Sequence, residues 1–193
     1  MDGVVDTRVD LAPPLEGALD AKLRDLEHRL GALEERAAED RVAIVVFSGD
    51  LDRVLAAFVI ATGAAAVGQQ VSMFFTFWGL SVIKKRTELS GKTLFQKMMA
   101  VMAPGSSRSL PVSKMNYFGA GAIMLRAMMK ARNVNSLEDL FSLAREMGVR
   151  MIACEMSRDV MGISESELVG GLEYGGVATF LADSLKARTS LFI

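Results

Sequence analysis

From residue 41 onward, short apolar runs alternate with amphipathic segments. The run VAIVVFS, over Val42–Ser48, is uninterrupted and rich in β-branched residues, as is typical of a strand buried on both faces. Leu51–Val67 then predicts a helix, and Val71–Phe77 predicts a second strand. A strand, a helix and a strand in this order form a βαβ unit, which indicates a parallel sheet.

The rest of the chain continues this alternation. The pattern predicts a helical, Met-rich stretch over 78–102, a long loop over Ala103–Ala120, a helix over Gly121–Arg132, a strand over Val149–Ala153 and a terminal strand in SLFI. We therefore expect an α/β fold with a mostly parallel sheet of about five strands and helices on both faces, a three-layer arrangement of the flavodoxin kind. Strand order does not follow from the sequence.

Capping signals mark three of the later boundaries. Ser136 with Asp139 is a start signal for a helix that Gly148 ends. Ser164 with Glu167 is a second capping box, and Gly175–Gly176 predicts a turn into a last helix.

The N-terminal part has a different pattern. Residues 1–16 predict a disordered lead-in, 17–40 predict an amphipathic helix, and 41–193 form the α/β domain. Leucines recur in the helix with steps of four and three, as in a coiled-coil seam; its members are Leu19, Leu23, Leu26, Leu30, Leu33 and Ala37. The seam predicts either self-association or docking on the chain's own domain, and both interpretations stay open.

Length and charge narrow the class of protein. The 193 residues, 51% of them hydrophobic, are enough for one well-filled core and an appendage. A formal net charge of -1 gives no indication of a nucleic-acid partner. Locally, however, residues 84–132 contain ten basic side chains against Glu88 alone, so we expect one cationic face that could dock an anion or an acidic partner.

The apolar stretch over 55–83 is long enough to raise the question of a membrane span. Gly68, Gln69 and Gln70 interrupt it, and VSMFFTF reads as a buried strand. The sequence thus argues against membrane association without excluding it.

Cysteine use points to a reducing compartment. The single cysteine, Cys154, excludes an internal disulfide. The first residues contain acids where a signal peptide has a basic start and an apolar run, so we expect a cytoplasmic protein.

The segments that follow the three predicted strands are expected to meet at one edge of the sheet, because the carboxyl ends of parallel strands lie at the same edge. Ligands and reacting groups gather there in parallel α/β folds. Cys154 follows the strand over Val149–Ala153, and the helix start after it would favour the reactive thiolate. A buried structural cysteine remains the alternative. The candidate site consists of Cys154 as nucleophile, Gly49, Asp50, Phe77 and Trp78 as walls, and Met156 and Ser157 in the turn that shapes the thiol.

The sequence lacks the residues that several common catalytic and binding sites require. The only histidine, His28, lies in the heptad helix, which argues against a Cys–His or Ser–His–Asp site in the domain. We expect no metal site and no cofactor. Gly91-Lys92-Thr93 is similar to the end of a phosphate-binding loop, but Arg86 stands where the first glycine is needed.

Six sequence motifs between Arg41 and Ile193 together resemble one known family. They are FSGDLD, FFTFWGL, MNYFGAGAIM, NVNSLEDL, ACEMSRDVMGI and GGVATFLADS. The chain resembles the DsrE/DsrF-like sulfur-relay family, in particular its larger DsrE-type branch, which is often labelled peroxiredoxin-like or as a sulfur reductase. The heptad helix lies outside this resemblance.

The resemblance implies a cytoplasmic, oligomeric α/β protein in which one cysteine carries sulfane sulfur as a persulfide. Cys154 occupies that position, and the implied partners are TusA-like or rhodanese-like sulfur-transfer proteins. The implied function is that of a sulfur carrier or sulfurtransferase. Because the chain has no second cysteine, the acceptor thiol must come from another chain or from a small molecule.

Two other functions remain open at this stage. The chain could be a non-catalytic assembly module whose cysteine only fills space. It could also bind a small ligand or a flavin on a flavodoxin-like scaffold.

Overall fold

The computed structural model describes residues 13–36 and 39–193, and it describes side chains for 17–31 and 40–193. The chain divides into two units, Met1–Ala37 and Ala38–Ile193. Residues 1–12 of the predicted lead-in over 1–16, and seam residue Ala37, lie outside the described residues.

The first unit contains one long helix, α1 (Pro13–Arg36). It begins four residues before the predicted start at 17, because the prolines that suggested a lead-in are tolerated in the first turn of a helix. It ends before 40, where β1 has already begun. Leu19, Leu23, Leu26 and Leu30 are all exposed, and Asp25 pairs with Arg29 one turn later.

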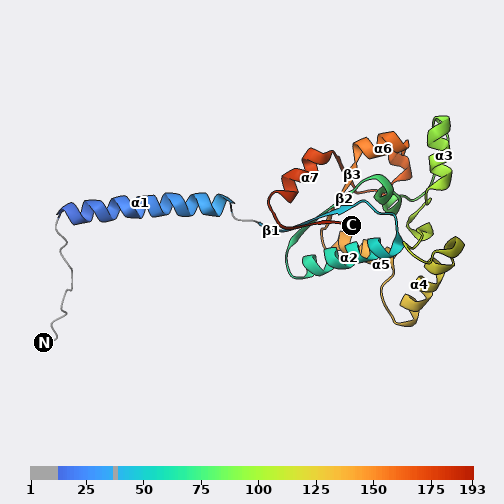
Figure 1. Ribbon diagram of the computed structural model, residues 1–193, viewed down its shortest axis with the longest axis horizontal. Coiled ribbons are helices and arrows are strands. Elements are labelled where there is room, and N and C mark those ends of the chain that lie inside the picture. The colour runs from blue at the N-terminus through green and yellow to red at the C-terminus, as the bar shows by residue number, and fades with distance from the viewer. Residues whose placement is uncertain (1–12, 37–38) are drawn as a thin grey trace. The chain divides into compact units, whose positions relative to one another are not determined.

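The second unit is a three-layer α/β domain (Figure 1). Its strands are β1 (Glu39–Val46), β2 (Gln70–Phe75), β3 (Arg150–Cys154), β4 (Glu173–Gly175) and β5 (Ala187–Phe192). They form one sheet in the order β4-β3-β2-β1-β5, with every neighbouring pair parallel. The predicted five-stranded parallel sheet is therefore confirmed.

Helices cover both faces of this sheet. The remaining elements are α2 (Leu51–Ala66), η1 (Phe77–Ile83), α3 (Leu94–Met102), η2 (Ser107–Ser109), η3 (Tyr117–Gly119), α4 (Ala120–Ala131), α5 (Leu137–Glu146), α6 (Glu155–Met161), η4 (Glu165–Glu167) and α7 (Val177–Ser184). In Figure 1, α2 and α5 lie on one side of the sheet, and α6 and α7 lie on the other.

Side chains alternate between two apolar clusters, as the period of a strand requires. Ile44 and Met73 point into the larger cluster, which α2 and α5 complete. Val45 and Phe74 point the other way, into a smaller cluster against which Phe180 of α7 packs. This second cluster contains Cys154.

The predicted helical stretch over 78–102 is wrong in its middle. Residues 84–93 are irregular, and Lys84 forms an antiparallel bridge with Leu168. Gly91 has a φ of +75°, which only glycine adopts readily, and Thr93 then caps α3 with Gln96 as the reciprocal partner. The sequence signal for this restart is the Thr-x-x-Gln spacing just after a glycine.

Both α3 and α4 stand at the periphery of the domain (Figure 1). Most of their apolar side chains are exposed, and they include Leu94, Phe95, Met98, Val101, Met102, Ile123, Met124 and Met128. Contiguous exposed apolar surfaces often mark interaction sites.

No helix in the described ranges combines the length and the hydropathy that a membrane span requires. The apolar stretch over 55–83 is divided among most of α2, the whole of β2 and η1.

Candidate functional site

Cys154 is the last residue of β3 and the residue that immediately precedes α6. Its side chain is only 1% exposed. It lies in the apolar cluster with Val45, Phe74 and Ile152. The predicted position at a strand's carboxyl end is confirmed, and the thiol there is enclosed by apolar groups.

Aromatic rings form the partly buried cover of this cluster. Phe180 packs against Phe74 with ring centroids 5.4 Å apart. Phe47 packs against the cluster from the loop after β1, and its ring lies 5.6 Å from those of Phe77 and Phe192. Because Cys154 is almost completely buried, a partner can reach its sulfur only if neighbouring groups move.

Ser157, which was predicted to shape the turn, is completely buried. Its hydroxyl is 2.7 Å from Thr76 Oγ1 at the end of β2, and this contact joins α6 to the neighbouring strand. Met156, by contrast, is half-exposed on α6. The two neighbours of the thiol therefore differ: Ser157 fixes the helix start, and Met156 faces solvent.

The predicted walls Gly49, Asp50 and Trp78 lie together around a cavity of about 260 Å³. It opens beyond the carboxyl end of β1, and its other lining residues are Phe47, Ser48, Arg53, Ser81, Pro104 and Pro111. We call it the β1-end cavity. Neither Cys154 nor Phe77 lines it, but Phe47 both lines the cavity and packs against the thiol's cluster.

The wall of the β1-end cavity depends on a close backbone approach. Gly79 N–H donates to Phe47 O at 2.9 Å. A Cβ on Gly79 would lie 2.0 Å from Val46 O, so only glycine permits η1 to lie this close to the end of β1.

The long loop over 103–120 is fastened to the start of α2. Leu51 N–H donates to Pro111 O at 2.6 Å, and Ser113 donates to Asp52 from both its backbone and its hydroxyl. Partial burial raises the pKa of Asp52, but the Ser113 hydrogen bonds outweigh it and the net pKa is lowered. These bonds hold Pro111 at the wall of the cavity, which Pro104 of the same loop also lines.

Polar groups in the β1-end cavity are incompletely paired. Asp50 accepts from the Ser48 hydroxyl at 3.0 Å, and its Oδ2 is 3.7 Å from Arg53 Nε. Ser81 is 1% exposed, and its hydroxyl has no hydrogen-bond partner among the described residues. Arg53 and Ser81 were not predicted from the sequence, although Arg53 lies one helical turn after Asp50.

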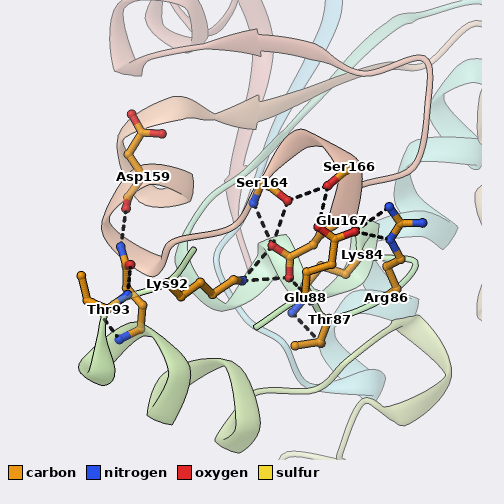
Figure 2. Close-up of polar contacts among 11 residues, drawn as sticks. Lys84, Arg86, Thr87, Glu88, Lys92, Thr93, Asp159, Ser164, Ser166 and Glu167 are labelled. Carbon is orange, nitrogen blue, oxygen red and sulfur yellow. Dashed lines mark hydrogen bonds and ion pairs between the residues drawn. The ribbon is translucent and has the colours of Figure 1, made fainter. Parts of the chain in front are cut away.

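A second polar region has the opposite character, and Figure 2 shows it. Glu167 is fully buried and accepts from Lys92 Nζ at 2.9 and 2.8 Å. It also accepts from the Glu88 N–H at 2.9 Å and the Ser164 N–H at 2.8 Å. We call these four residues the Glu167 clamp.

The electrostatics of the clamp follow from burial and pairing. Burial raises the pKa of Glu167, but the Lys92 contact and the backbone donors prevail and leave it lowered. Burial lowers the pKa of the adjacent Lys84, against the attraction of Glu167. The Gly91-Lys92-Thr93 segment thus places its lysine in an internal ion pair, and the Ser164–Glu167 capping box closes only the short turn η4.

No group of three or more His, Cys, Asp or Glu side chains within the described ranges is arranged to hold a metal ion.

Comparison with known proteins supplies the family. The model of the DsrE/DsrF/DrsH-like family matches residues 38–192, which include every strand of the sheet. The chain belongs to this family. The resemblance drawn from the sequence motifs is confirmed, and α1 lies outside the match.

Two curated relatives align with the same part of the chain. The uncharacterized protein YrkE of Bacillus subtilis (strain 168) is 42% identical over 154 residues, which span 79% of this chain and 96% of that protein. The sulfur carrier protein DsrE2 of Allochromatium vinosum is 34% identical over 158 residues, which span 80% and 99%. The crystal structure of the ychN protein from E. coli, at 12% identity, has a TM-score of 0.46 and covers 79% of this chain and 98% of that one.

Proposed function

We propose that this protein is a sulfur carrier that holds sulfane sulfur as a persulfide on Cys154. In the loading step, the Cys154 thiolate attacks the outer sulfur of a donor persulfide, the donor's S–S bond breaks, and the donor leaves as a thiolate. In the unloading step, an acceptor thiolate attacks the outer sulfur on Cys154 and releases the Cys154 thiolate. No net oxidation occurs, and each cycle makes the protein a sulfurtransferase.

The position of Cys154 is the observation that carries this proposal. It is the only thiol in the chain, and it lies where the sheet's carboxyl edge meets the start of α6. Membership of the family and a curated sulfur-carrier relative at 34% identity support the same role.

The aromatic cover fits a carrier whose cargo must be shielded. A persulfide exposed to water and free thiols is lost between encounters, so a carrier needs protection as well as access. Phe47 and Phe180, both only partly buried, are the groups whose displacement would open the site.

Mass spectrometry of the intact protein tests the loading step. Exposure to inorganic polysulfide should add the mass of one sulfur atom to the wild-type chain and nothing to Cys154→Ser. Dithiothreitol should remove the added mass. An equal gain in Cys154→Ser, or no gain in the wild type, contradicts the proposal.

A second experiment tests the cover. Phe180→Ala should raise the alkylation rate of Cys154 by iodoacetamide, because it removes a ring that packs on the thiol's cluster. The matched control is Phe141→Ala, which removes a ring that packs on Phe58 in the other apolar layer. Equal acceleration in both variants would show that general loosening, not the cover, controls access.

The proposed setting is the cytoplasm, where thiols are kept reduced, and the proposed acceptors and donors are TusA-like or rhodanese-like proteins. We also propose a homo-oligomer. Both the leucine seam of α1 and the apolar faces of α3 and α4 would otherwise stay in water.

Light scattering distinguishes the two surfaces. Leu23→Ser with Leu30→Ser should reduce the oligomer if the seam of α1 forms a coiled coil. Phe95→Ser with Val101→Ser should reduce it if α3 lies in the interface. An unchanged mass in both double variants contradicts these assignments.

One observation favours a second function, that of a binding module with a structural cysteine. The Cys154 side chain is as deeply buried as its apolar neighbours. This alternative predicts no sulfur uptake and no alkylation of the folded protein, even in Phe180→Ala.

A further inference from the structure

The β1-end cavity contains groups that no part of the proposed loading step uses. Ser81 is buried with an unpaired hydroxyl, which destabilises a native structure unless a ligand or water completes its hydrogen bonds. Asp50 and Arg53 line the same cavity with opposite charges. Together they are features of a built binding site at the sheet edge where parallel α/β folds bind ligands.

The two charges retain capacity for a ligand. Arg53 Nε is 3.7 Å from Asp50 Oδ2, too long for a hydrogen bond, and the two side chains are 57% and 31% exposed. Such a pair holds its partners weakly. A guanidinium has five N–H donors and a carboxylate has two acceptor oxygens, so each can also bind a group of opposite charge on a small molecule.

The rest of the lining is apolar and the volume is small. Phe47, Trp78, Pro104 and Pro111 supply aromatic and aliphatic walls. A volume of about 260 Å³ suits a small organic molecule and not a dinucleotide.

We infer that the β1-end cavity binds a low-molecular-weight zwitterionic thiol or its persulfide, that is, cysteine or a short cysteine peptide. Its ammonium group meets Asp50, and its carboxylate meets Arg53 and the Ser81 hydroxyl. Its sulfur-bearing part lies against the apolar wall. Phe47 belongs both to that wall and to the cover of Cys154, so the ligand lies next to the group that must move. This inference deepens the proposed function, on which the ligand's role as sulfur donor or acceptor rests.

Trp78 provides a direct readout, because it is the only tryptophan of the chain, lines the cavity and is 44% exposed. The experiment titrates full-length Cys154→Ser with L-cysteine under reducing conditions and follows tryptophan fluorescence. Cys154→Ser is used so that no covalent sulfur transfer contributes to the signal. A saturable change is expected, and its absence overturns the inference.

Four comparison ligands test the two charges and the sulfur. Cysteamine lacks the carboxylate, 3-mercaptopropionate lacks the ammonium group, 2-mercaptoethanol lacks both, and L-serine replaces the sulfur with oxygen. Each should bind about tenfold or more weakly than L-cysteine, the change expected from one lost charged or apolar contact. If cysteamine or 3-mercaptopropionate binds as tightly as L-cysteine, the ligand is not recognised as a zwitterion. If L-serine binds as tightly, the ligand is not recognised by its thiol.

Variants with matched controls locate the site. Ser81→Ala and Arg53→Gln should each weaken L-cysteine binding about tenfold. Ser72→Ala removes another buried, unpaired hydroxyl that does not line the cavity, and Arg132→Gln removes an exposed charge at the end of α4. Both controls should bind as the parent does; equal weakening in the controls overturns the assignment.

Failure of this inference is distinguishable from failure of the carrier function. If wild type gains sulfur from polysulfide but Trp78 reports no L-cysteine binding, only the ligand site is wrong. If L-cysteine binds with the expected pattern but wild type never gains sulfur, the ligand site stands and the carrier function is wrong.

Discussion

The Glu167 clamp and the β1-end cavity both contain polar groups removed from bulk water, but they differ in how completely those groups are paired. Glu167 receives donors from a lysine and from two backbone amides. Ser81 in the cavity has no partner in the described part of the chain, and Asp50 is held only loosely by Arg53. Complete pairing indicates a structural role, whereas incomplete pairing beside a cavity indicates a place for a ligand.

The largest expected effect comes from breaking the clamp. Glu167→Gln removes the negative charge that faces Lys92 and leaves a buried, unpaired cation, so the free energy of unfolding should fall by about 3–5 kcal/mol. Chemical denaturation measures this loss. The control is Glu165→Gln on the same turn, whose exposed pair with Arg158 should cost less than about 1 kcal/mol. Similar losses in both variants would show that the clamp is no stronger than a surface pair.

At acidic pH, wild type and Glu167→Gln should differ less in their free energy of unfolding. The pKa of Glu167 is lowered in the folded state, so its contribution is fully present above the unfolded value near 4.5 and is lost as pH falls through the folded pKa. Below pH 4.5 the wild type should therefore lose stability faster than the variant. Denaturation midpoints across this pH range measure how steeply the stability of each protein falls with pH. Parallel curves for wild type and variant would argue against a lowered pKa.

Substitutions at two buried serines test the same comparison through smaller changes in the free energy of unfolding. Ser157→Ala leaves the buried Thr76 hydroxyl without its 2.7 Å partner and should cost about 1–3 kcal/mol. Ser81→Ala removes a hydroxyl that has no partner, so stability should change by less than about 0.5 kcal/mol or increase. Thermal or chemical unfolding of the two variants checks the order; a larger loss for Ser81→Ala would reverse the interpretation of the cavity.

A small effect is also expected at the loose pair in the cavity. Asp50→Asn keeps an acceptor for the Ser48 hydroxyl and removes only a partly exposed charge 3.7 Å from Arg53. The free energy of unfolding should fall by less than about 1 kcal/mol. A loss comparable with that of Glu167→Gln would place Asp50 among the structural groups and weaken the case for a ligand there.

The parts of the fold that were predictable are those with local signals. The apolar runs of β1, β2 and β3 predicted parallel strands, and the carboxyl-edge position of Cys154 followed from them. Ser136 and Asp139 form the capping box that their spacing predicts. The strand order was not predictable, because it depends on pairing between segments far apart in the chain.

The site was only partly predictable for the same reason. Gly49, Asp50 and Trp78 share a wall because two strands end side by side, which the sheet topology implies. That Ser81 would be buried without a partner, or that Glu167 would pair with Lys92, depends on side-chain packing between distant segments. Local spacing predicted the Ser164–Glu167 capping box but not the ion pair between Glu167 and Lys92, which is the more important contact.

The place of β5 in the sheet has a consequence for how the protein is made. β5 pairs with β1, and Ile193 O accepts the Phe47 and Ser48 N–H groups just beyond it. During translation β1 is therefore synthesised long before the strand that closes its outer edge. An open strand edge is a template for pairing with other chains, and such long-range closure is slow. Expression at low temperature and a slow synthesis rate should consequently favour soluble protein over aggregate.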